Sequence, residues 1–185
     1  MKNTIILSFL IFFCSAFSCN QSGSVENTSS KNISKSKVLL KEIDALEAKL
    51  RKAKLVTDEM PAAQELVKKS QSYSELHPQD KKTAAVLFKA ADLARGIGQY
   101  GKAIQLWGKV WRNYPDFDKA PDAVFMQAFT YENNLGDIQN AKRYYLQFIE
   151  KFPKNPLREQ AVIALKNLGK SPEDLIKEFQ KNEKK

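Results

Sequence analysis

The pattern of apolar and polar positions predicts helices over most of the chain. In the first amphipathic stretch, Leu39, Ile43, Leu46, Leu50 and Ala53 follow one another at spacings of four, three, four and three residues. This spacing places them on one face of a helix. No stretch alternates apolar and polar residues over any length, as a half-buried strand would. The pattern therefore predicts an all-α protein, with short loops joining antiparallel neighbours.

Later apolar runs predict the positions of the other helices. These cover residues 64–73, 83–97, 102–114, 120–135 and 138–152, with a shorter helix over 160–168. Pro61 is expected at the first position of the helix that continues over residues 64–73, where proline is tolerated. Residues 171–174 (SPED) have the pattern of a helix cap and predict a final helix to Gln180.

The first 18 residues have the layout of a secretory signal peptide. Lys2 supplies a positive charge, residues 5–13 form a largely apolar run of nine, and Ala16 and Ser18 are small residues just before Cys19. The apolar run is shorter than the ~20 residues that a membrane-spanning helix needs. We therefore expect an exported protein.

Cys19, placed directly after this segment, resembles the lipidated cysteine of bacterial lipoproteins. The resemblance implies a lipid on the Cys19 thiol and an acylated new N-terminus. Asn20 follows instead of aspartate, which by the same resemblance favours the outer membrane. Several acyl chains would anchor the protein durably. Ordinary cleavage at the same bond, leaving a free Cys19, is the alternative interpretation.

Residues 20–36 are expected to form a flexible tether. They contain six Ser and three Asn, with Val25 and Ile33 as the only aliphatic residues. Such a composition cannot bury enough apolar surface to fold. The expected organisation is a signal peptide (1–18), the lipidated Cys19 with a disordered tether (19–36), a helical domain (37–182) and a tail (183–185).

The breaks between the predicted helices recur with a period of 37 or 38 residues. The repeated positions are Pro78, Pro115 and Pro153, then Gly98 and Gly136, then Ala103 and Ala141. Self-similarity at this period predicts a helical repeat solenoid. The glycines are expected to end helices in the left-handed conformation, and the alanines to allow two helices to cross closely.

These positions resemble the tetratricopeptide repeat. The first copy, counted from Ala84, has Leu87, Ala90, Ala91, Ala94, Ala103, Trp107 and Pro115, and the second, from Asp122, has Phe125, Ala128, Phe129, Ala141, Tyr145, Phe148 and Pro153. The resemblance covers roughly residues 45–168, with a degenerate copy before these two and half a copy after them. It implies a right-handed solenoid of three to four antiparallel helix hairpins.

The long period and the aromatic–proline strings around Pro115 and Pro153 are similar to those of tetratricopeptide proteins of the bacterial envelope. These include the lipoprotein of the outer-membrane barrel-assembly machine and the periplasmic coordinator of the Tol–Pal system. The chain has fewer repeats than the first. Its lipoprotein signal and short heptad stretch distinguish it from the second.

In tetratricopeptide proteins the first helix of each repeat lines a concave face that binds peptides or partner helices. The resemblance places six residues of this chain there: Phe88, Asp92, Arg95, Met126, Thr130 and Asn133. Apolar, methionine and charged side chains suit a peptide groove. The expected function is that of a membrane-anchored protein-binding adaptor of the envelope that acts in outer-membrane or envelope assembly. We expect it to bind a protein or peptide segment and no nucleic acid.

The composition argues against several kinds of chemistry. One His and two Cys disfavour a zinc site, a disulfide framework and a Cys–His nucleophile pair, so we expect no enzyme, no cofactor and no metal. The formal net charge is +9, but the basic residues are interleaved with acidic ones. This indicates a solvated surface instead of nucleic-acid binding, with contact to anionic lipid or lipopolysaccharide as a second interpretation.

Several conspicuous residues have structural explanations. His77 is expected to cap a helix end or to face solvent, and Trp107 to lie in the core. Trp111 either packs between repeats or stacks a ligand. Asp116 and Asp118 are expected in a turn, where aspartate is favoured. Residues 39–53 fit either the first helix of the degenerate repeat or a coiled-coil helix of a structural oligomer, which would need no peptide groove.

Overall fold

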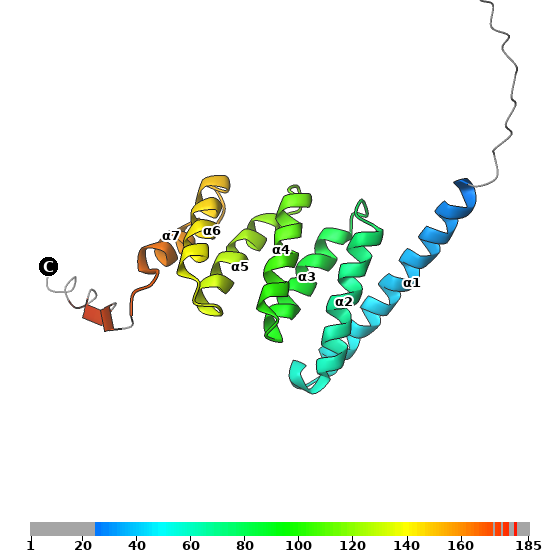
Figure 1. Ribbon diagram of the computed structural model, residues 1–185, viewed down its shortest axis with the longest axis horizontal. Helices are drawn as coiled ribbons and strands as arrows, with labels where there is room; N and C mark the ends of the chain where they lie inside the picture. The colour runs from blue at the N-terminus through cyan, green and yellow to red at the C-terminus, as the bar shows by residue number, and fades with distance from the viewer. Residues whose placement is uncertain (1–24, 172, 175, 178–179, 181–185) are drawn as a thin grey trace, which may run out of the picture. The chain divides into compact units, whose positions relative to one another are not determined.

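The computed structural model describes residues 25–171 and, after them, residues 173, 174, 176, 177 and 180. All regular structure in these residues is helical (Figure 1). The elements are α1 (Val25–Lys52), the 3₁₀ helix η1 (Val56–Glu59), α2 (Met60–Leu76), α3 (Thr83–Gly96), α4 (Tyr100–Asn113), α5 (Ala120–Asn133), α6 (Ile138–Lys151) and α7 (Arg158–Asn167). The expected all-α repeat solenoid is confirmed.

The chain divides into two units, Met1–Ser34 and Lys35–Lys185, and the second contains the repeats. The predicted signal peptide and Cys19 lie outside the described residues. Within the described part of the chain, no helix is both long enough and apolar enough to cross a membrane.

The predicted helices of the repeats are confirmed closely. The helices α3, α5 and α6 begin at the expected residues, Thr83, Ala120 and Ile138. The helix α2 begins at Met60, with Pro61 in its first turn as predicted. At the C-terminal side, the Ser171 hydroxyl accepts a hydrogen bond from the Asp174 N–H at 3.1 Å, as the capping pattern predicts.

The expected flexible tether is wrong over residues 25–36, which form the first part of α1. The apolar face of the following residues packs against the repeats and stabilises a helix there. Adding a turn to an existing helix costs less free energy than nucleating a new one. No proline or glycine interrupts residues 25–36. Composition alone predicted disorder because it ignores this extension from a neighbouring helix.

The periodic glycines and alanines have the predicted roles. Gly98 and Gly136 follow their helices with φ of +80° and +63°, a conformation that favours glycine. Ala103 and Ala141 are completely buried. Their small side chains allow the second helix of each hairpin to lie close to the first, so that α3 packs against α4 and α5 against α6.

Two apolar clusters form the core of the array. One is centred on Trp107 and includes Leu87, while the other is centred on Tyr145 and Phe148. Trp107 and Tyr145 are both fully buried, as the repeat pattern implies. The half-buried ring of Trp111 packs against both clusters and so joins successive hairpins.

The second half of α1 packs onto the repeats. Ile43, on the predicted apolar face, is 2% exposed. Glu42 pairs with Lys69 of α2 at 2.8 Å, and Glu47 pairs with Lys89 of α3 at 3.1 Å. These contacts support the interpretation of residues 39–53 as a repeat helix instead of a free coiled-coil strand.

Replacing Trp107 with alanine should destabilise the protein by ~3–5 kcal/mol, the range for truncating a large buried aromatic side chain. Leu146→Ala is the control, because Leu146 lies on α6 and is 47% exposed. Thermal or chemical unfolding followed by circular dichroism measures both. Equal stability of the Trp107 variant and the wild type would contradict the placement of Trp107 in the core.

Candidate partner-binding groove

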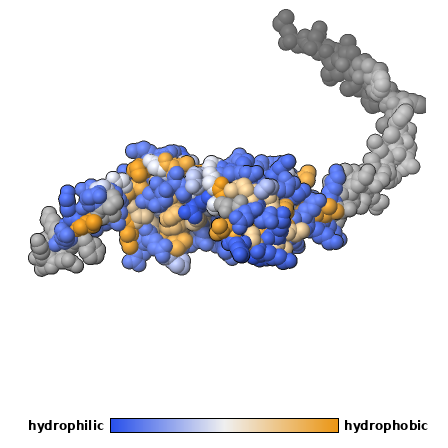
Figure 2. Space-filling model, turned by 90° about the horizontal axis from the view of Figure 1, so that it is seen from below, coloured by the Kyte–Doolittle hydropathy of each residue, from blue (hydrophilic) through white to orange (hydrophobic). Residues whose placement is uncertain are grey.

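The helices α3 and α5, the first helices of successive hairpins, line a cavity of about 330 Å³. The lining residues are Phe88, Asp92, Arg95, Asp122, Phe125, Met126 and Leu157. Four of the six residues predicted for the groove thus meet at one cavity: Phe88, Asp92, Arg95 and Met126. The face seen in Figure 2 is mainly hydrophilic and is interrupted by hydrophobic patches.

The apolar part of the cavity is continuous with the core. Phe88 is 8% exposed and meets the ring of Phe117 edge-on, with centroids 6.2 Å apart. Met126 is half-buried and packs against the same cluster. The Lys119 ammonium lies 5.4 Å from the Phe88 ring centroid. Phe88 therefore supports the fold as well as the cavity, and little of its surface is available to a ligand.

Asp92 brings a negative charge to this apolar cavity. Its carboxylate accepts a hydrogen bond from Trp107 Nε1 at 3.2 Å. The residue as a whole is exposed, but partial burial of the carboxyl group raises its pKa. The Trp107 hydrogen bond and the nearby charges of Lys119 and Arg95 lower the pKa and offset part of this effect. Perturbed carboxyl groups in cavities are frequent at functional sites.

Arg95 lies at the same cavity and is held in place by two contacts. Its Nε donates to Asn134 Oδ1 at 3.1 Å, and its guanidinium carbon lies 4.9 Å from the Phe129 ring centroid. Both contacts cross from α3 to the α5 region. The remaining guanidinium N–H groups can bind a carboxylate or a backbone carbonyl of a partner.

Two predicted groove residues do not take part. Thr130 is fully buried, so the prediction that it lines an open groove is wrong. It stands one repeat after Asp92, but α5 turns this smaller side chain into the core. Asn133 is exposed and donates to the Phe129 carbonyl of its own helix at 3.1 Å, away from the cavity's lining set. The second copy therefore contributes less polar surface than the pattern suggested.

Sequence reasoning missed three lining residues, Asp122, Phe125 and Leu157. Asp122 lies one helical turn before Met126, so extending the same stripe would have found it. Burial raises the pKa of Asp122. Phe125 is a repeat position of the second copy, and the centroid of its ring lies 5.7 Å from that of Tyr145 and 5.6 Å from that of Phe148. Leu157 precedes α7, and no motif marks it.

The buried aromatic of each repeat is tied to a carboxylate on the preceding helix. Trp107 donates to Asp92, and in the second copy Tyr145 Oη donates to Glu132 at 2.7 Å. Burial and the Glu132 carboxylate raise the pKa of Tyr145, so its hydroxyl stays protonated. These bonds fix the first helix against the second and thereby hold the cavity walls in place.

The other conspicuous residues have structural positions. His77 is the C-terminal cap residue of α2, as predicted, and its N–H donates to the Tyr73 carbonyl at 2.9 Å. Asp116 and Asp118 lie in the loop between α4 and α5. Within the described residues, no group of three His, Cys, Asp or Glu side chains is arranged to hold a metal ion.

A comparison with known families shows what this arrangement is similar to. The tetratricopeptide repeat model matches residues 85–116 and 122–155, the two hairpins α3–α4 and α5–α6. These two stretches are therefore similar to tetratricopeptide repeats. Comparisons with curated proteins and with solved structures found no match. Tetratricopeptide repeats are typically non-catalytic scaffolds for protein–protein interaction, and the groove lies on the first helices of both matched copies.

Replacing Asp92 with asparagine should raise the midpoint of thermal unfolding at neutral pH. The folded-state pKa is raised, so the deprotonation of Asp92 destabilises the fold as the pH rises through that pKa. Asparagine keeps an oxygen to accept the Trp107 hydrogen bond and carries no charge. The advantage should disappear below the ordinary aspartate pKa of about 3.9, where both states are protonated.

The midpoints of thermal unfolding of the wild type and of Asp92→Asn, measured at several pH values, test this prediction. Asp116→Asn is the control, because Asp116 is exposed. A lower midpoint for Asp92→Asn at neutral pH would instead show that the charged form of Asp92 stabilises the repeats.

Proposed function

We propose that this protein is an adaptor that binds a segment of a partner protein in the groove between α3 and α5. The observation that supports it most directly is the convergence of Phe88, Asp92, Arg95 and Met126 on one cavity of about 330 Å³. An apolar side chain of the partner would enter against Phe88 and Met126. The unlike charges of Asp92 and Arg95 would set the orientation of its backbone.

We further propose that the adaptor is anchored in the bacterial outer membrane by a lipid on Cys19. Lys2, the apolar run of residues 5–13 and the small residues before Cys19 support this. The partner would then be a protein segment of the cell envelope, presented to a scaffold held near the membrane. A role in outer-membrane or envelope assembly follows from this address together with the repeats.

Arg95→Gln should weaken capture of the partner without unfolding the protein. Truncating an interface hot spot typically costs at least ~2 kcal/mol, roughly a thirtyfold loss of affinity. Arg143→Gln is a matched control, because the Arg143 guanidinium also lies 4.9 Å from an aromatic ring centroid, that of Tyr144, outside the groove.

The measurement is quantitative mass spectrometry of proteins co-purified from solubilised membranes, with circular dichroism to verify folding. The adaptor proposal expects one set of proteins to be lost with Arg95→Gln and retained with Arg143→Gln. If both folded variants capture every protein at the wild-type level, the groove is not the binding surface.

Metabolic labelling with a fatty-acid analogue should label the wild-type protein and not Cys19→Ala. Cys19 is the residue whose thiol would carry the lipid, so its removal eliminates the only attachment atom that the signal provides. Cys14→Ala serves as control and should label normally. An unlabelled wild type, or labelling of Cys19→Ala at the wild-type level, would rule out the proposed anchor.

A further inference from the structure

A second cavity lies away from the groove, where α4 and α6 end. It has a volume of about 410 Å³ and is lined by Trp111, Arg112, Pro115, Ala120, Lys151 and Phe152. We call this set the basic notch. It shares no lining residue with the groove between α3 and α5. Whatever binds in it therefore makes contacts separate from those of a partner in the groove.

Two cations in the notch are arranged around one aromatic ring. The Arg112 guanidinium carbon lies 5.0 Å from the Trp111 ring centroid, and Lys151 Nζ lies 5.8 Å from it. Both residues stand in the last turn of their helices, where the helix dipole favours a positive charge. The dipole accounts for the sign of the charges. It does not account for their convergence on the same ring beside a cavity.

The Trp111 ring is fixed by a buried hydrogen-bond chain. Trp111 Nε1 donates to Gln127 Oε1 at 2.7 Å, and Gln127 Nε2 donates to the Ile104 carbonyl at 2.7 Å. Gln127 is 1% exposed. A buried amide with both ends bonded holds its partner firmly, so the wall of the notch is organised before any ligand arrives.

The absence of a side chain at Gly108 leaves room for the Arg112 guanidinium against its own helix. A Cβ at this position would come within 2.7 Å of Arg112 Nη2 and 3.0 Å of Nη1. Glycine inside a helix lowers stability relative to alanine. Gly108 thus lowers the stability of α4 relative to alanine and leaves room for the Arg112 guanidinium at the edge of the notch.

The charges of the notch are uncompensated. Among the described residues, neither Arg112 nor Lys151 forms a salt bridge, and no acidic residue lines the notch. The corresponding position one repeat earlier has the opposite character. There a cavity of about 600 Å³ is lined by Asp80, Asp116 and Asp118, with Lys81 as its only cation.

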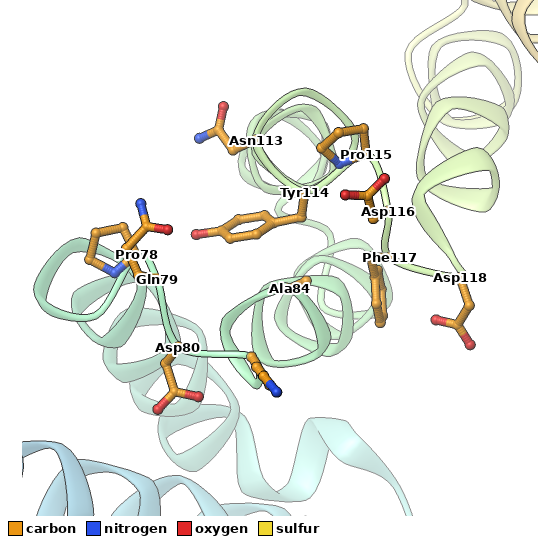
Figure 3. A pocket seen from close by; sticks show the side chains of 11 residues that line it. Pro78, Gln79, Asp80, Ala84, Asn113, Tyr114, Pro115, Asp116, Phe117 and Asp118 are labelled. Atoms are coloured by element: carbon orange, nitrogen blue, oxygen red, sulfur yellow. The ribbon is translucent and has the colours of Figure 1, made fainter.

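Figure 3 shows this acidic cavity, with Tyr114 extending from the end of α4 toward Pro78 and Gln79. The repeat architecture alone therefore does not dictate a basic lining. The positive charge belongs to the notch between the two matched repeats and not to every junction of the array.

We propose that the basic notch binds an acidic segment of a protein partner. A carboxylate would lie between Arg112 and Lys151 and form charge-assisted hydrogen bonds with them. An adjacent apolar side chain would pack against Pro115 and Phe152. The hollow form and aromatic lining of the notch suit a side chain better than a membrane surface, and Trp and Arg are enriched at interface hot spots.

The two tryptophans of the chain provide separate reporters for the two surfaces. The Trp111 indole lines the notch, and the Trp107 indole donates to Asp92 at the groove. The test uses the full chain with ¹⁵N-labelled tryptophan. The probes are a short synthetic peptide with two aspartates flanking a phenylalanine and the same peptide with lysines in place of the aspartates.

The acidic peptide should shift the Trp111 indole signal saturably and leave that of Trp107 in place, while the lysine peptide should shift neither. Arg112→Gln and Lys151→Gln should each weaken binding about tenfold, as expected for loss of a hydrogen bond to a charged group. Arg143→Gln, a cation on the same helix as Lys151, should not. Gly108→Ala keeps both charges but displaces the guanidinium, so it should weaken binding while the protein stays folded.

Three results would overturn the proposal. They are an unmoved Trp111 signal, an equal loss of binding with Arg143→Gln, and tighter binding to phosphatidylglycerol vesicles than to the peptide, which would make the notch a lipid-binding surface. A shift of Trp107 alone would place the acidic peptide in the groove. That result would support the adaptor function and contradict the notch, so the two proposals fail separately.

Discussion

The structure depends on the burial of helix faces that a single hairpin cannot cover. In each repeat a fully buried alanine, Ala103 or Ala141, is followed one helical turn later by a large buried aromatic side chain, Trp107 or Tyr145. The alanines bring the two helices of a hairpin close, and the aromatic side chains bond to the first helix of the same hairpin, at Asp92 and Glu132. Because α4 also packs against α5, the core continues from one repeat to the next. Stacking is therefore the source of stability, as in other quasi-one-dimensional folds.

The groove is a consequence of this stacking. One face of each of the first helices α3 and α5 packs into the core, and the cavity lies beside it, where partly buried side chains of the two helices meet. The bonds from Trp107 to Asp92 and from Tyr145 to Glu132 connect the core to this face. The walls are thus positioned by the most deeply buried side chains of the molecule, which suits a surface that must be rigid before a partner binds.

The sequence predicted the periodic parts of the structure because period and packing have the same cause. The residues Gly98, Gly136, Ala103 and Ala141 each have one physical role that recurs in both copies. The prediction of a flexible tether was wrong over residues 25–36, because a composition rich in serine and asparagine does not reveal that α1 extends back from the packed residues that follow. The prediction for Thr130 was wrong because its repeat position corresponds to that of Asp92, while the burial of its side chain depends on how α5 packs. The sequence predicted neither the place of Leu157 at the groove nor the basic notch at Arg112 and Lys151. Both cavities are lined by residues from different repeats, and no local sequence pattern indicates such long-range contacts.

The most direct test of the account is site-specific photo-crosslinking of the protein in intact cells. A photoreactive amino acid at Met126 stands in the groove, and one at Leu146, on α6, stands outside both the groove and the basic notch. The account predicts a discrete protein adduct from position 126 and none from position 146. Adducts from position 146 alone, or the same adducts from both positions, would contradict the claim that the first helices of the repeats hold the partner.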